Sequence, residues 1–547
     1  MMKATRMTGG QALVKSITAH GVDTIFGLPG VQLDWFFNAL HDEGNNIRVI
    51  NSRHEQGVAY MAHGYAQSTG KVGVFAVVPG PGVLNTTAAL STSLAANVPV
   101  FCITGQIPSG HIGRGYGQLH EIPDQLSVLR GLTKWAERID HATEAPGKVA
   151  EAFKQLHTGR PQPVAVEMPL DQLAKTCNVV LPDLAVDYPR PPLDEDAVAA
   201  AVKLLAGAKS PMIFVGGGAL ACGEAVQNLA EILQAPVISN RTGKGILSSR
   251  HYLSLSQYAG HRLWPKADVV LAVGSRLQQP RMNWGTDDGL KIIHVDIDPV
   301  EIQRIGGADV EIVGDARDVV PALERAVGGL TPKRQSRKDE MTALDSQIYA
   351  YLEKKLPPQM AWIKVLRKAL DDDGIFVDEL TQVGYVSRVA MPIYHPRTFL
   401  TSAYQGTLGA GFATAIGAKV AHPDKQVLSI NGDGGFMYNV QELATAVKYN
   451  IPVVAIIFAD GAYGNVQRMQ QELYDNRTIA SDLTNPDFVA LAESFGCAAY
   501  RVETPEEMAK TLPEAFRQPV PTVIEVPFPP TPDPWSVIIP PRNRPAA

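Results

Sequence analysis

The stretch that decides the fold spans residues 426–461 and reads QVLSINGDGGFMYNVQELATAVKYNIPVVAIIFADG. Its first apolar run, residues 426–430, predicts a buried strand and leads into a glycine-rich turn. Apolar residues then recur at the spacing of an α-helix: Val440, Leu443, Ala444 and Val447. A second apolar run, residues 453–458, follows. The stretch therefore predicts a β-α-β unit of a parallel sheet.

Two aspartates follow the two predicted strands, Asp433 in the glycine-rich turn and Asp460 after the second run. In a right-handed β-α-β unit both strands point the same way, so both carboxylates reach the carboxyl edge of the sheet, where ligands bind. Gly432, Gly434 and Gly435 let the backbone approach a diphosphate, and carboxylate oxygens suit Mg2+. Either turn alone is an ordinary Gly/Asp turn, but their joint position favours a metal and diphosphate site.

The rest of the chain repeats this alternation of short apolar runs and helical patterns, which is typical of parallel α/β units. A length of 547 residues suits about three domains of ordinary size. The predicted strands form three blocks: residues 24–26, 47–51, 72–78, 98–104 and 163–167; 212–215, 236–239, 269–273 and 292–296; and 375–377, 426–430, 453–458 and 522–526. The predicted fold class is therefore α/β, with three doubly wound, parallel-sheet domains.

Two proline-rich or polar segments separate the blocks, residues 181–192 and 331–346. We therefore predict domains at residues 1–180, 190–330 and 355–530. The proline-rich tail, residues 531–547, cannot pair as a central strand, so we expect it to lie as an arm on the surface.

Composition excludes several classes of protein. The net charge is only -6 and no dense Lys/Arg run is present, so nucleic-acid binding has no driving force. No apolar stretch approaches the length of a membrane span, and residues 1–21 do not resemble a signal peptide. The 4 cysteines lie far apart without metal-ligand spacing. We therefore expect a cytoplasmic protein that binds neither nucleic acid nor membrane.

The string Gly432-Asp433-Gly434, followed after a helix and a strand by Asp460, resembles the thiamine diphosphate motif, which opens with GDG and ends in an Asn pair. Here the pair is Ala459-Asp460. The resemblance implies that Asp433 and Asp460 bind Mg2+ through their side chains and that Ala462 supplies a backbone carbonyl. Aspartate in place of asparagine keeps an oxygen ligand and adds negative charge.

Two further strings resemble cofactor-binding segments of the same enzymes. Arg53-His54-Glu55-Gln56-Gly57 resembles the segment whose glutamate shares a proton with the pyrimidine ring, so we expect Glu55 to be buried among apolar groups with a raised pKa. A lone glutamate at a helix start is otherwise favoured by the helix dipole. In Gly406-Thr407-Leu408-Gly409-Ala410-Gly411 the resemblance implies that Leu408 is the apolar wedge between the cofactor rings and that the Gly406 carbonyl accepts from the pyrimidine amino group.

The resemblance to acetolactate synthase-like enzymes extends over nearly the whole chain. Four more strings fall in the same order: Phe26-Gly27-Leu28-Pro29-Gly30, Val78-Pro79-Gly80-Pro81-Gly82, Gly243-Lys244-Gly245 and Val295-Asp296-Ile297-Asp298-Pro299. They imply a pyrimidine-binding, a central and a diphosphate-binding domain, with Pro29 beside the cofactor. In such enzymes the cofactor bridges two subunits, Glu55 coming from one and Asp433 from the other. We therefore expect a homodimer at minimum and a homotetramer as the common assembly.

The residues that would select the reaction depart from the family pattern. Leu119-His120-Glu121 stands where acetolactate synthases show Phe-Gln-Glu, so His120 is a candidate proton shuttle. Gln32 occupies a place that is histidine in some relatives that cleave or join aldehydes, and it is a second catalytic candidate. Either residue could instead be structural. Met469 replaces the tryptophan by which biosynthetic synthases prefer a larger acceptor.

The central block raises the question of a nucleotide. Gly216-Gly217-Gly218 after an apolar strand could approach a phosphate. Flavin-binding synthases carry a string like Arg-Phe-Asp-Asp-Arg where this chain has Arg276-Leu277-Gln278-Gln279-Pro280-Arg281. FAD is therefore doubtful, and a pocket that is empty or holds ADP is at least as well supported.

The resemblance implies thiamine diphosphate-dependent decarboxylation of a 2-oxo acid such as pyruvate, followed by carboligation to a second carbonyl compound. The enzyme would be a transferase or a lyase. Two alternatives stay open: a non-ligating 2-oxo acid decarboxylase or aldehyde lyase, like benzoylformate decarboxylase or benzaldehyde lyase, and a non-catalytic paralogue.

Overall fold

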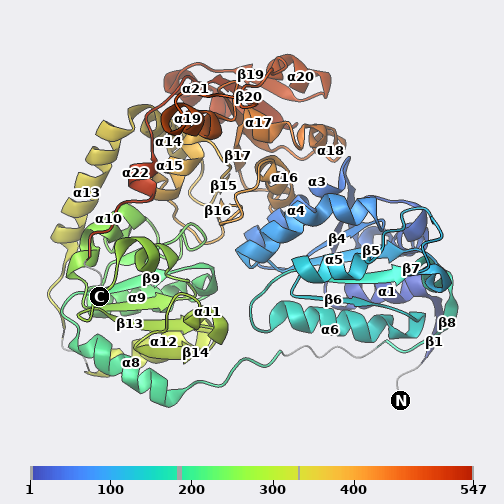
Figure 1. Cartoon of the computed structure of the whole chain (residues 1–547), viewed down its shortest axis with the longest axis horizontal. Coiled ribbons are helices and arrows are strands. Elements are labelled where there is room, and N and C mark those ends of the chain that lie inside the picture. Colours follow the sequence, from blue (N-terminus) through green and yellow to red (C-terminus); the bar gives the residue numbers. More distant parts are fainter. Residues whose placement is uncertain (1–3, 182–187, 331–332, 545–547) are drawn as a thin grey trace.

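Three six-stranded parallel sheets, each flanked by helices, organise the molecule (Figure 1). The computed structural model describes residues 4–181, 188–330 and 333–544. The predicted α/β class with three parallel-sheet domains is confirmed. No helix in these ranges is long and apolar enough to cross a membrane.

The first sheet has the strand order β3-β2-β4-β5-β7-β6. Its strands are β2 (Thr24–Gly27), β3 (Arg48–Asn51), β4 (Gly73–Val77), β5 (Val100–Gln106), β6 (Trp135–Arg138) and β7 (Val164–Pro169). The α-helices around it are α1 (Gly9–Ala19), α2 (Asp34–Asp42), α3 (Glu55–Thr69), α4 (Pro81–Ala96), α5 (Gln125–Leu132), α6 (Ala145–His157) and α7 (Leu170–Ala174). Strands β1 (Thr5–Thr8) and β8 (Thr176–Val179) form a small antiparallel pair. This pair joins the beginning of the first domain to its end.

The central sheet has the order β11-β10-β9-β12-β13-β14. Its strands are β9 (Pro211–Val215), β10 (Val237–Ser239), β11 (Ser254–Leu255), β12 (Val269–Val273), β13 (Lys291–Asp296) and β14 (Val310–Val313). The α-helices are α8 (Glu195–Gly207), α9 (Gly223–Leu233), α10 (Gln257–Leu263), α11 (Pro299–Gln303) and α12 (Ala316–Leu330).

The third sheet has the order β16-β15-β17-β18-β20-β19. Its strands are β15 (Ile375–Val377), β16 (Phe399–Leu400), β17 (Val427–Gly432), β18 (Val454–Ala459), β19 (Ala498–Arg501) and β20 (Thr522–Pro527). The α-helices are α13 (Lys338–Lys355), α14 (Pro357–Ala369), α15 (Gln382–Ala390), α16 (Ala410–Ala421), α17 (Asp433–Phe436), α18 (Leu443–Lys448), α19 (Gly464–Leu473), α20 (Phe488–Ser494), α21 (Pro505–Ala515) and α22 (Trp535–Ile538).

Every predicted strand coincides with an observed one, but two predicted segments differ. The helix expected between the strands of the deciding stretch is broken into α17, a 3-10 turn (Val440–Glu442) and α18, since the chain turns at Asn439 before the apolar face begins. The polar segment 331–346 contains the start of α13 at Lys338, while residues 331–332 lie outside the described ranges. Of the predicted linker, residues 182–187 also lie outside them.

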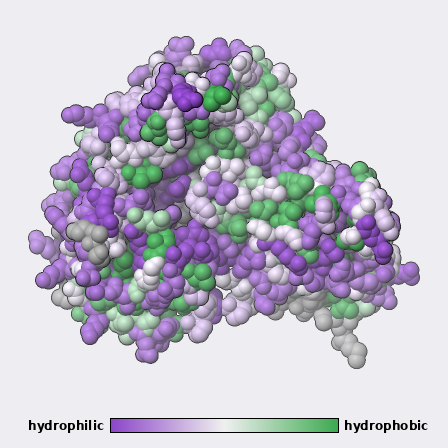
Figure 2. Space-filling model, viewed as in Figure 1, coloured by the Kyte–Doolittle hydropathy of each residue, from purple (hydrophilic) through white to green (hydrophobic). Residues whose placement is uncertain are grey.

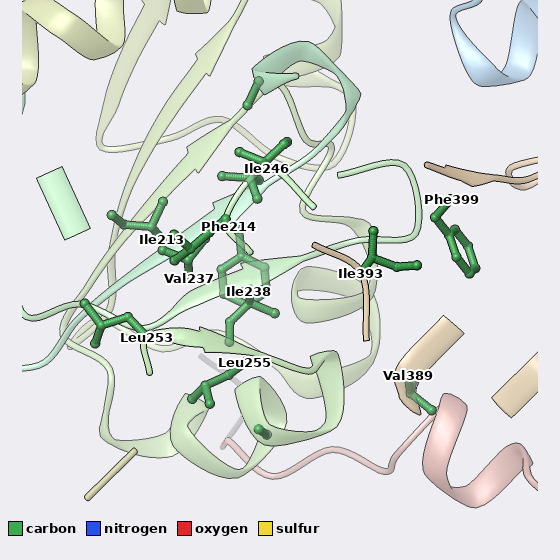
Figure 3. Close-up of a cluster of buried hydrophobic side chains, with 14 of the residues drawn as sticks. Ile213, Phe214, Val237, Ile238, Ile246, Leu253, Leu255, Val389, Ile393 and Phe399 are labelled. Atoms are coloured by element: carbon green, nitrogen blue, oxygen red, sulfur yellow. The ribbon is translucent and has the colours of Figure 1, made fainter. Parts of the chain in front are cut away.

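Apolar packing ties the central and third domains together. One buried cluster contains Ile213, Ile238 and Ile246 from the central domain and Ile393 and Phe399 from the third (Figure 3). The shared core stabilises the contact between two domains whose sheets are separate, because burying apolar area contributes about 25 cal/mol per Å².

The proline-rich tail crosses back over the central domain. His261 lies 2.8 Å from the Pro541 carbonyl, and Arg544 donates to the carbonyls of Trp264 and Ala267, each at 2.9 Å. The described part of the tail, residues 531–544, is thus held on the central domain by hydrogen bonds to backbone carbonyls and forms no strand.

Candidate active site

Asp433 and Asp460 meet at the carboxyl edge of the third sheet. Strand β17 ends at Gly432 and its parallel neighbour β18 ends at Ala459, with Gly432 opposite Phe458 in the ladder. Each aspartate directly follows its strand, so both side chains start from the same edge. The fold thus brings the two carboxylates together, whereas their role as metal ligands stays a prediction.

A cavity of about 310 Å³ opens at this edge. Its lining includes all the third-domain residues that the sequence singled out: Gly406, Leu408, Gly432, Asp433, Gly434, Gly435, Asp460 and Ala462. Other segments contribute polar and aromatic side chains: Thr381, Gln382, Tyr385, Tyr463 and Asn465. A concave site of this size with a few convergent polar groups is typical of cofactor and substrate binding.

Asp433 is buried and held by three hydrogen bonds. Its Oδ1 accepts from the Gly434 amide at 2.8 Å, and its Oδ2 accepts from the Gly461 amide at 2.8 Å and from Asn485 Nδ2 at 2.7 Å. These bonds fix the direction of the carboxylate before any ligand binds. Asn485 was missed by the sequence interpretation because it lies outside any motif, on a loop beyond α19.

Asp460 lies close to a like charge. Burial, and after it the negative charge of Asp433, raises the pKa of Asp460 to about 6. A cation between two such carboxylates would relieve their repulsion. Mg2+ prefers oxygen ligands and is commonly held by one or two carboxylates together with a phosphate. The donor set therefore fits Mg2+ beside a diphosphate, and the described residues contain no group of three or more His, Cys, Asp or Glu that could hold a metal instead.

The glycines of the turn are required by packing. A Cβ on Gly434 would lie 2.8 Å from the Tyr463 ring, and a Cβ on Gly435 would overlap Glu379 Oε1. The sequence predicted that these glycines let the backbone approach a diphosphate. The structure adds a second reason, since neighbouring side chains leave no room for a larger residue.

Glu379 is a buried carboxyl group that the sequence interpretation missed. Its Oε1 accepts from the Gly409 amide at 2.6 Å, whereas Oε2 finds no partner among the described residues. Burial raises the pKa of Glu379 to about 8, so the side chain is mostly protonated at neutral pH. Glu379 follows β15 by two residues at the same sheet edge. An acidic residue just after a predicted strand is the signal that could have identified it.

Gly406 and Leu408 lie on the loop before α16. Gly406 has a φ of +59°, in the left-handed region that favours glycine. Leu408 is half-buried and lines the cavity. An apolar side chain and an accessible backbone at these positions suit the wedge and the carbonyl acceptor that the resemblance implies.

The remaining candidates lie at the carboxyl edge of the first sheet. Pro29 and Gln32 follow β2, Glu55 follows β3, and His120 lies in the segment after β5. These strands run parallel within one sheet, so their following loops gather at one edge. The first domain therefore assembles a second set of candidate residues.

Glu55 is the first residue of α3 and is half-buried in the single chain. Its Oε2 accepts from Asn85 Nδ2 at 3.0 Å. The described residues do not enclose Glu55 among apolar groups as expected, since its side chain is only half-buried and nearby Pro29 is exposed.

Gln32 and His120 are in direct contact. Gln32 Oε1 lies 3.0 Å from His120 Nδ1, and Gln32 Nε2 donates to the Leu119 carbonyl at 2.9 Å. Gln32 is only 4% exposed, whereas His120 is half-buried. The sequence singled out these two residues separately, and the fold places them side by side.

Among the residues that the structure describes, Glu55 is not part of the lining of the third-domain cavity. Helices α3 and α16 lie side by side (Figure 1). They run antiparallel, because a Cβ on Gly64 would overlap the Thr414 carbonyl whereas one on Gly417 would overlap that of Met61. Glu55 therefore lies at the end of the pair opposite to the start of α16, roughly 20 Å away at the rise of an α-helix.

A further cavity of about 310 Å³ lies beside the carboxyl edge of the central sheet, with Gly217, Gly218 and Asp296 in its lining. In the string compared with flavin-binding synthases, Arg276 pairs with Glu301, and Arg281 donates to backbone carbonyls, one of them that of Ile305. Both arginines are thus engaged within the chain, so this string gives no support for a flavin contact.

Comparison with known proteins agrees with this arrangement of domains. Residues 7–128 match the N-terminal thiamine pyrophosphate (thiamine diphosphate) binding domain of thiamine pyrophosphate enzymes, residues 198–323 their central domain, and residues 381–526 their C-terminal thiamine pyrophosphate binding domain.

Curated relatives align over nearly the whole chain. A probable acetolactate synthase large subunit of Methanococcus aeolicus is 34% identical, covering 93% of this chain and 90% of the relative. A probable 2-ketoarginine decarboxylase of Pseudomonas aeruginosa is 34% identical, covering 96% and 95%. An acetolactate synthase isozyme 3 large subunit of Escherichia coli is 30% identical, covering 94% and 92%. The chain therefore belongs to the thiamine pyrophosphate enzymes, in the group that contains the acetolactate synthase large subunits.

Proposed function

We propose that this enzyme decarboxylates a 2-oxo acid such as pyruvate and joins the remaining fragment to a second carbonyl compound, with thiamine diphosphate and Mg2+ as cofactors. The observation that carries the proposal is the convergence of Asp433 and Asp460 on one cavity whose glycine-rich wall can accept a diphosphate. When bound, thiamine diphosphate supplies a carbon nucleophile and an electron sink.

The chain would hold the cofactor by residues of the third domain. Asp433, Asp460 and the Ala462 carbonyl would bind Mg2+, and the amides of the turn Gly432-Asp433-Gly434-Gly435 would face the diphosphate. Leu408 would fix the relative angle of the two rings, and the Gly406 carbonyl would accept from the pyrimidine amino group. A site from which water is excluded would favour loss of carboxylate charge from the substrate.

Residues of the first domain would handle protons. Glu55 would share a proton with the pyrimidine ring, Pro29 would lie beside that ring, and His120 would accept and return a proton near the reacting carbonyl. Since Glu55 and Asp433 lie apart in one chain, a complete site needs the first domain of a second copy.

Exposed apolar side chains on both half-sites support a homodimer. Within the described chain none of the residues of α19 is buried, although the helix borders the cavity. The exposed apolar residues around it and around the first-domain edge are Val466, Met469, Leu473, Tyr474 and Ile479, and Val31, Leu84, Tyr116 and Leu119. Figure 2 shows apolar residues gathered over the part of the first domain that carries α4. We propose a cytoplasmic homodimer that assembles further into a homotetramer, with domains at residues 1–180, 190–330 and 355–530.

The test is a product assay. The protein is incubated with thiamine diphosphate, Mg2+ and pyruvate, and CO2, acetaldehyde and carboligation products are measured. Carboligation products support the proposal. Glu55→Gln should bind the cofactor and give no turnover, and undiminished turnover by this variant would remove the role of Glu55.

A non-ligating decarboxylase is the second candidate, because one relative is named a probable 2-ketoarginine decarboxylase. CO2 and aldehyde without ligated product, from pyruvate or from a panel of longer and cationic 2-oxo acids, would favour it. A non-catalytic paralogue is disfavoured because Glu55, Asp433, Asp460 and Leu408 all suit their roles. We further propose that the central cavity holds ADP or nothing, which chromatography of the denatured protein would test by looking for flavin and adenine nucleotides.

A further inference from the structure

The contact between Gln32 and His120 defines the chemistry of the histidine ring. Gln32 is buried on a 3-10 turn (Val31–Leu33) in the loop that follows β2. Its amide makes two hydrogen bonds, one to the Leu119 carbonyl at 2.9 Å and one with His120 Nδ1 at 3.0 Å. Both partners belong to the segment that departs from the family pattern.

The Leu119 carbonyl decides which way the Gln32 amide points. A carbonyl oxygen only accepts, so the amide nitrogen must face Leu119 and the amide oxygen must face His120. A flipped amide would place two acceptors against each other at 2.9 Å and would lose that bond. Because Gln32 Oε1 also only accepts, His120 Nδ1 must carry the hydrogen. In the neutral ring the lone pair then lies on Nε2.

The backbone of His120 is held as firmly as its ring. His120 has a φ of +68°, an uncommon conformation for a residue with a side chain. Its carbonyl lies so close to Gly80 that a Cβ there would overlap it, and the Gly80 amide donates to buried Gln125 Oε1 at 2.8 Å. Residues held in strained backbone conformations by their surroundings cluster at functional sites.

We propose that Gln32 is a positioning residue, which fixes His120 in the Nδ1–H tautomer and makes Nε2 the atom that accepts a proton from substrate or water. The inference rests on the proposed function, in which His120 faces the reacting carbonyl. In this step Nε2 gains one proton and the ring then carries one positive charge. The same proton is later returned, so protons and charge are conserved. Nδ1 keeps its hydrogen throughout, so the bond to Gln32 persists in both charge states.

A double-mutant cycle on the cofactor-loaded enzyme tests the inference. His120→Gln removes the proton acceptor, so kcat should fall about 10²- to 10⁴-fold. Gln32→Met keeps the length of the side chain and removes both hydrogen bonds, so kcat should fall about tenfold with KM and thiamine diphosphate affinity unchanged. In the His120→Gln background, Gln32→Met should have no further effect, because Gln32 acts only through His120.

Two results of the cycle would overturn the inference. An equal loss from Gln32→Met in both backgrounds would mean that Gln32 acts structurally and not through His120. Full activity of His120→Gln would mean that the ring transfers no essential proton. If the wild-type protein converts no 2-oxo acid at all, the proposed function fails, and the state of the ring is then decided by chemical modification instead.

Diethyl pyrocarbonate acylates an unprotonated imidazole nitrogen. Its rate of reaction with His120 therefore reports the tautomer of the ring without requiring catalytic turnover. The rate of modification of His120 is followed by peptide mass spectrometry on protein without cofactor. Gln32→Met should slow it about two- to tenfold, the change in population that one hydrogen bond supports. Gln118→Met is the matched control, because its side chain makes no hydrogen bond to His120 within the described chain, and it should react at the wild-type rate. An unchanged rate in Gln32→Met would overturn the inference.

Discussion

The two halves of the candidate site differ in how complete they are within one chain. The third-domain half is a cavity with a buried, triply hydrogen-bonded Asp433, whereas the first-domain half leaves Glu55 half-buried and Pro29 exposed. A single chain can therefore preorganise the anchor for a cofactor, but the residues that would act on protons stand at an open surface. The difference teaches that the residues proposed for anchoring and for proton transfer lie on separate domains, which the proposed dimer would join.

The largest effect is expected where the anchor is removed. Asp433→Ala deletes one carboxylate of the pair and leaves Asn485 and the Gly461 amide without their acceptor, so cofactor affinity and kcat/KM should each fall more than about 10³-fold. Calorimetric titration with thiamine diphosphate and Mg2+ measures the affinity. Asp475→Asn, at an exposed turn, is the control and should bind normally. Retained affinity in Asp433→Ala would mean that the third domain is not the anchor.

Mixing two inactive variants tests whether assembly joins the halves. On the proposed function, Glu55→Gln and Asp433→Ala should each inactivate both sites of their own dimer. A mixed dimer holds one intact site and one doubly altered site, so random re-association of equal amounts should restore about a quarter of wild-type activity. The measurement is activity after co-refolding or co-expression. Activity no higher than that of the separate variants would mean that Glu55 and Asp433 act in one site within one chain. The two halves of the site would then not be joined by assembly.

Stability should depend on the contact that keeps the halves apart. A Cβ on Gly64 of α3 would overlap the Thr414 carbonyl of α16, so Gly64→Ala should lower the free energy of unfolding by about 1–3 kcal/mol. Gly147 in α6 has open space around its Cα, and Gly147→Ala should raise stability by up to about 1 kcal/mol through helix propensity. Denaturant unfolding measures the free energy of unfolding of both variants. Equal free energies of unfolding for the two variants would show that α3 and α16 can move apart without loss of stability.

The sequence predicted the interior of each sheet better than its edges. All five unpredicted strands of the three main sheets lie at sheet edges: β6, β11, β14, β16 and β19. Two of them, β11 and β16, are only two residues long, and β6 ends in two charged residues, Glu137 and Arg138. Edge strands are kept short or charged because a long apolar edge would pair with another chain, and this weakens their pattern. The edge strand β3 was predicted because it contains the β-branched pair Val49-Ile50.

The candidate site likewise contains residues that the sequence predicted and contacts that it did not. Asp433 and Asp460 were predictable because each follows a strand within one short motif, and parallel pairing alone carries them to one edge. Asn485 could not be predicted, because its contact with Asp433 crosses 52 residues of chain without a motif. The pairing of Gln32 with His120 crosses 88 residues and depends on how two loops pack. Local spacing thus predicted which residues reach an edge, whereas tertiary packing decided which of them touch.

The smallest effect concerns Glu379, the buried carboxyl beside the anchor. Its folded-state pKa of about 8 lies above the value near 4.3 of an unfolded chain, so the stability it contributes is fully present at low pH and is lost as pH rises towards 8. Between pH 6 and pH 7 this group should lower the free energy of unfolding by about 1.4 kcal/mol.

Glu379→Gln removes this titration while keeping an acceptor for the Gly409 amide, so the variant should lack that part of the pH dependence and still bind the cofactor. Denaturant unfolding at the two pH values gives the difference between wild type and variant, with exposed Glu503→Gln as the control that keeps the wild-type dependence. If Glu379→Gln and wild type lose stability equally, Glu379 is ionised in the folded protein. Gly409 would then donate to a buried negative charge that packs against Gly435 of the glycine-rich turn, and the amides of this turn would have to balance that charge.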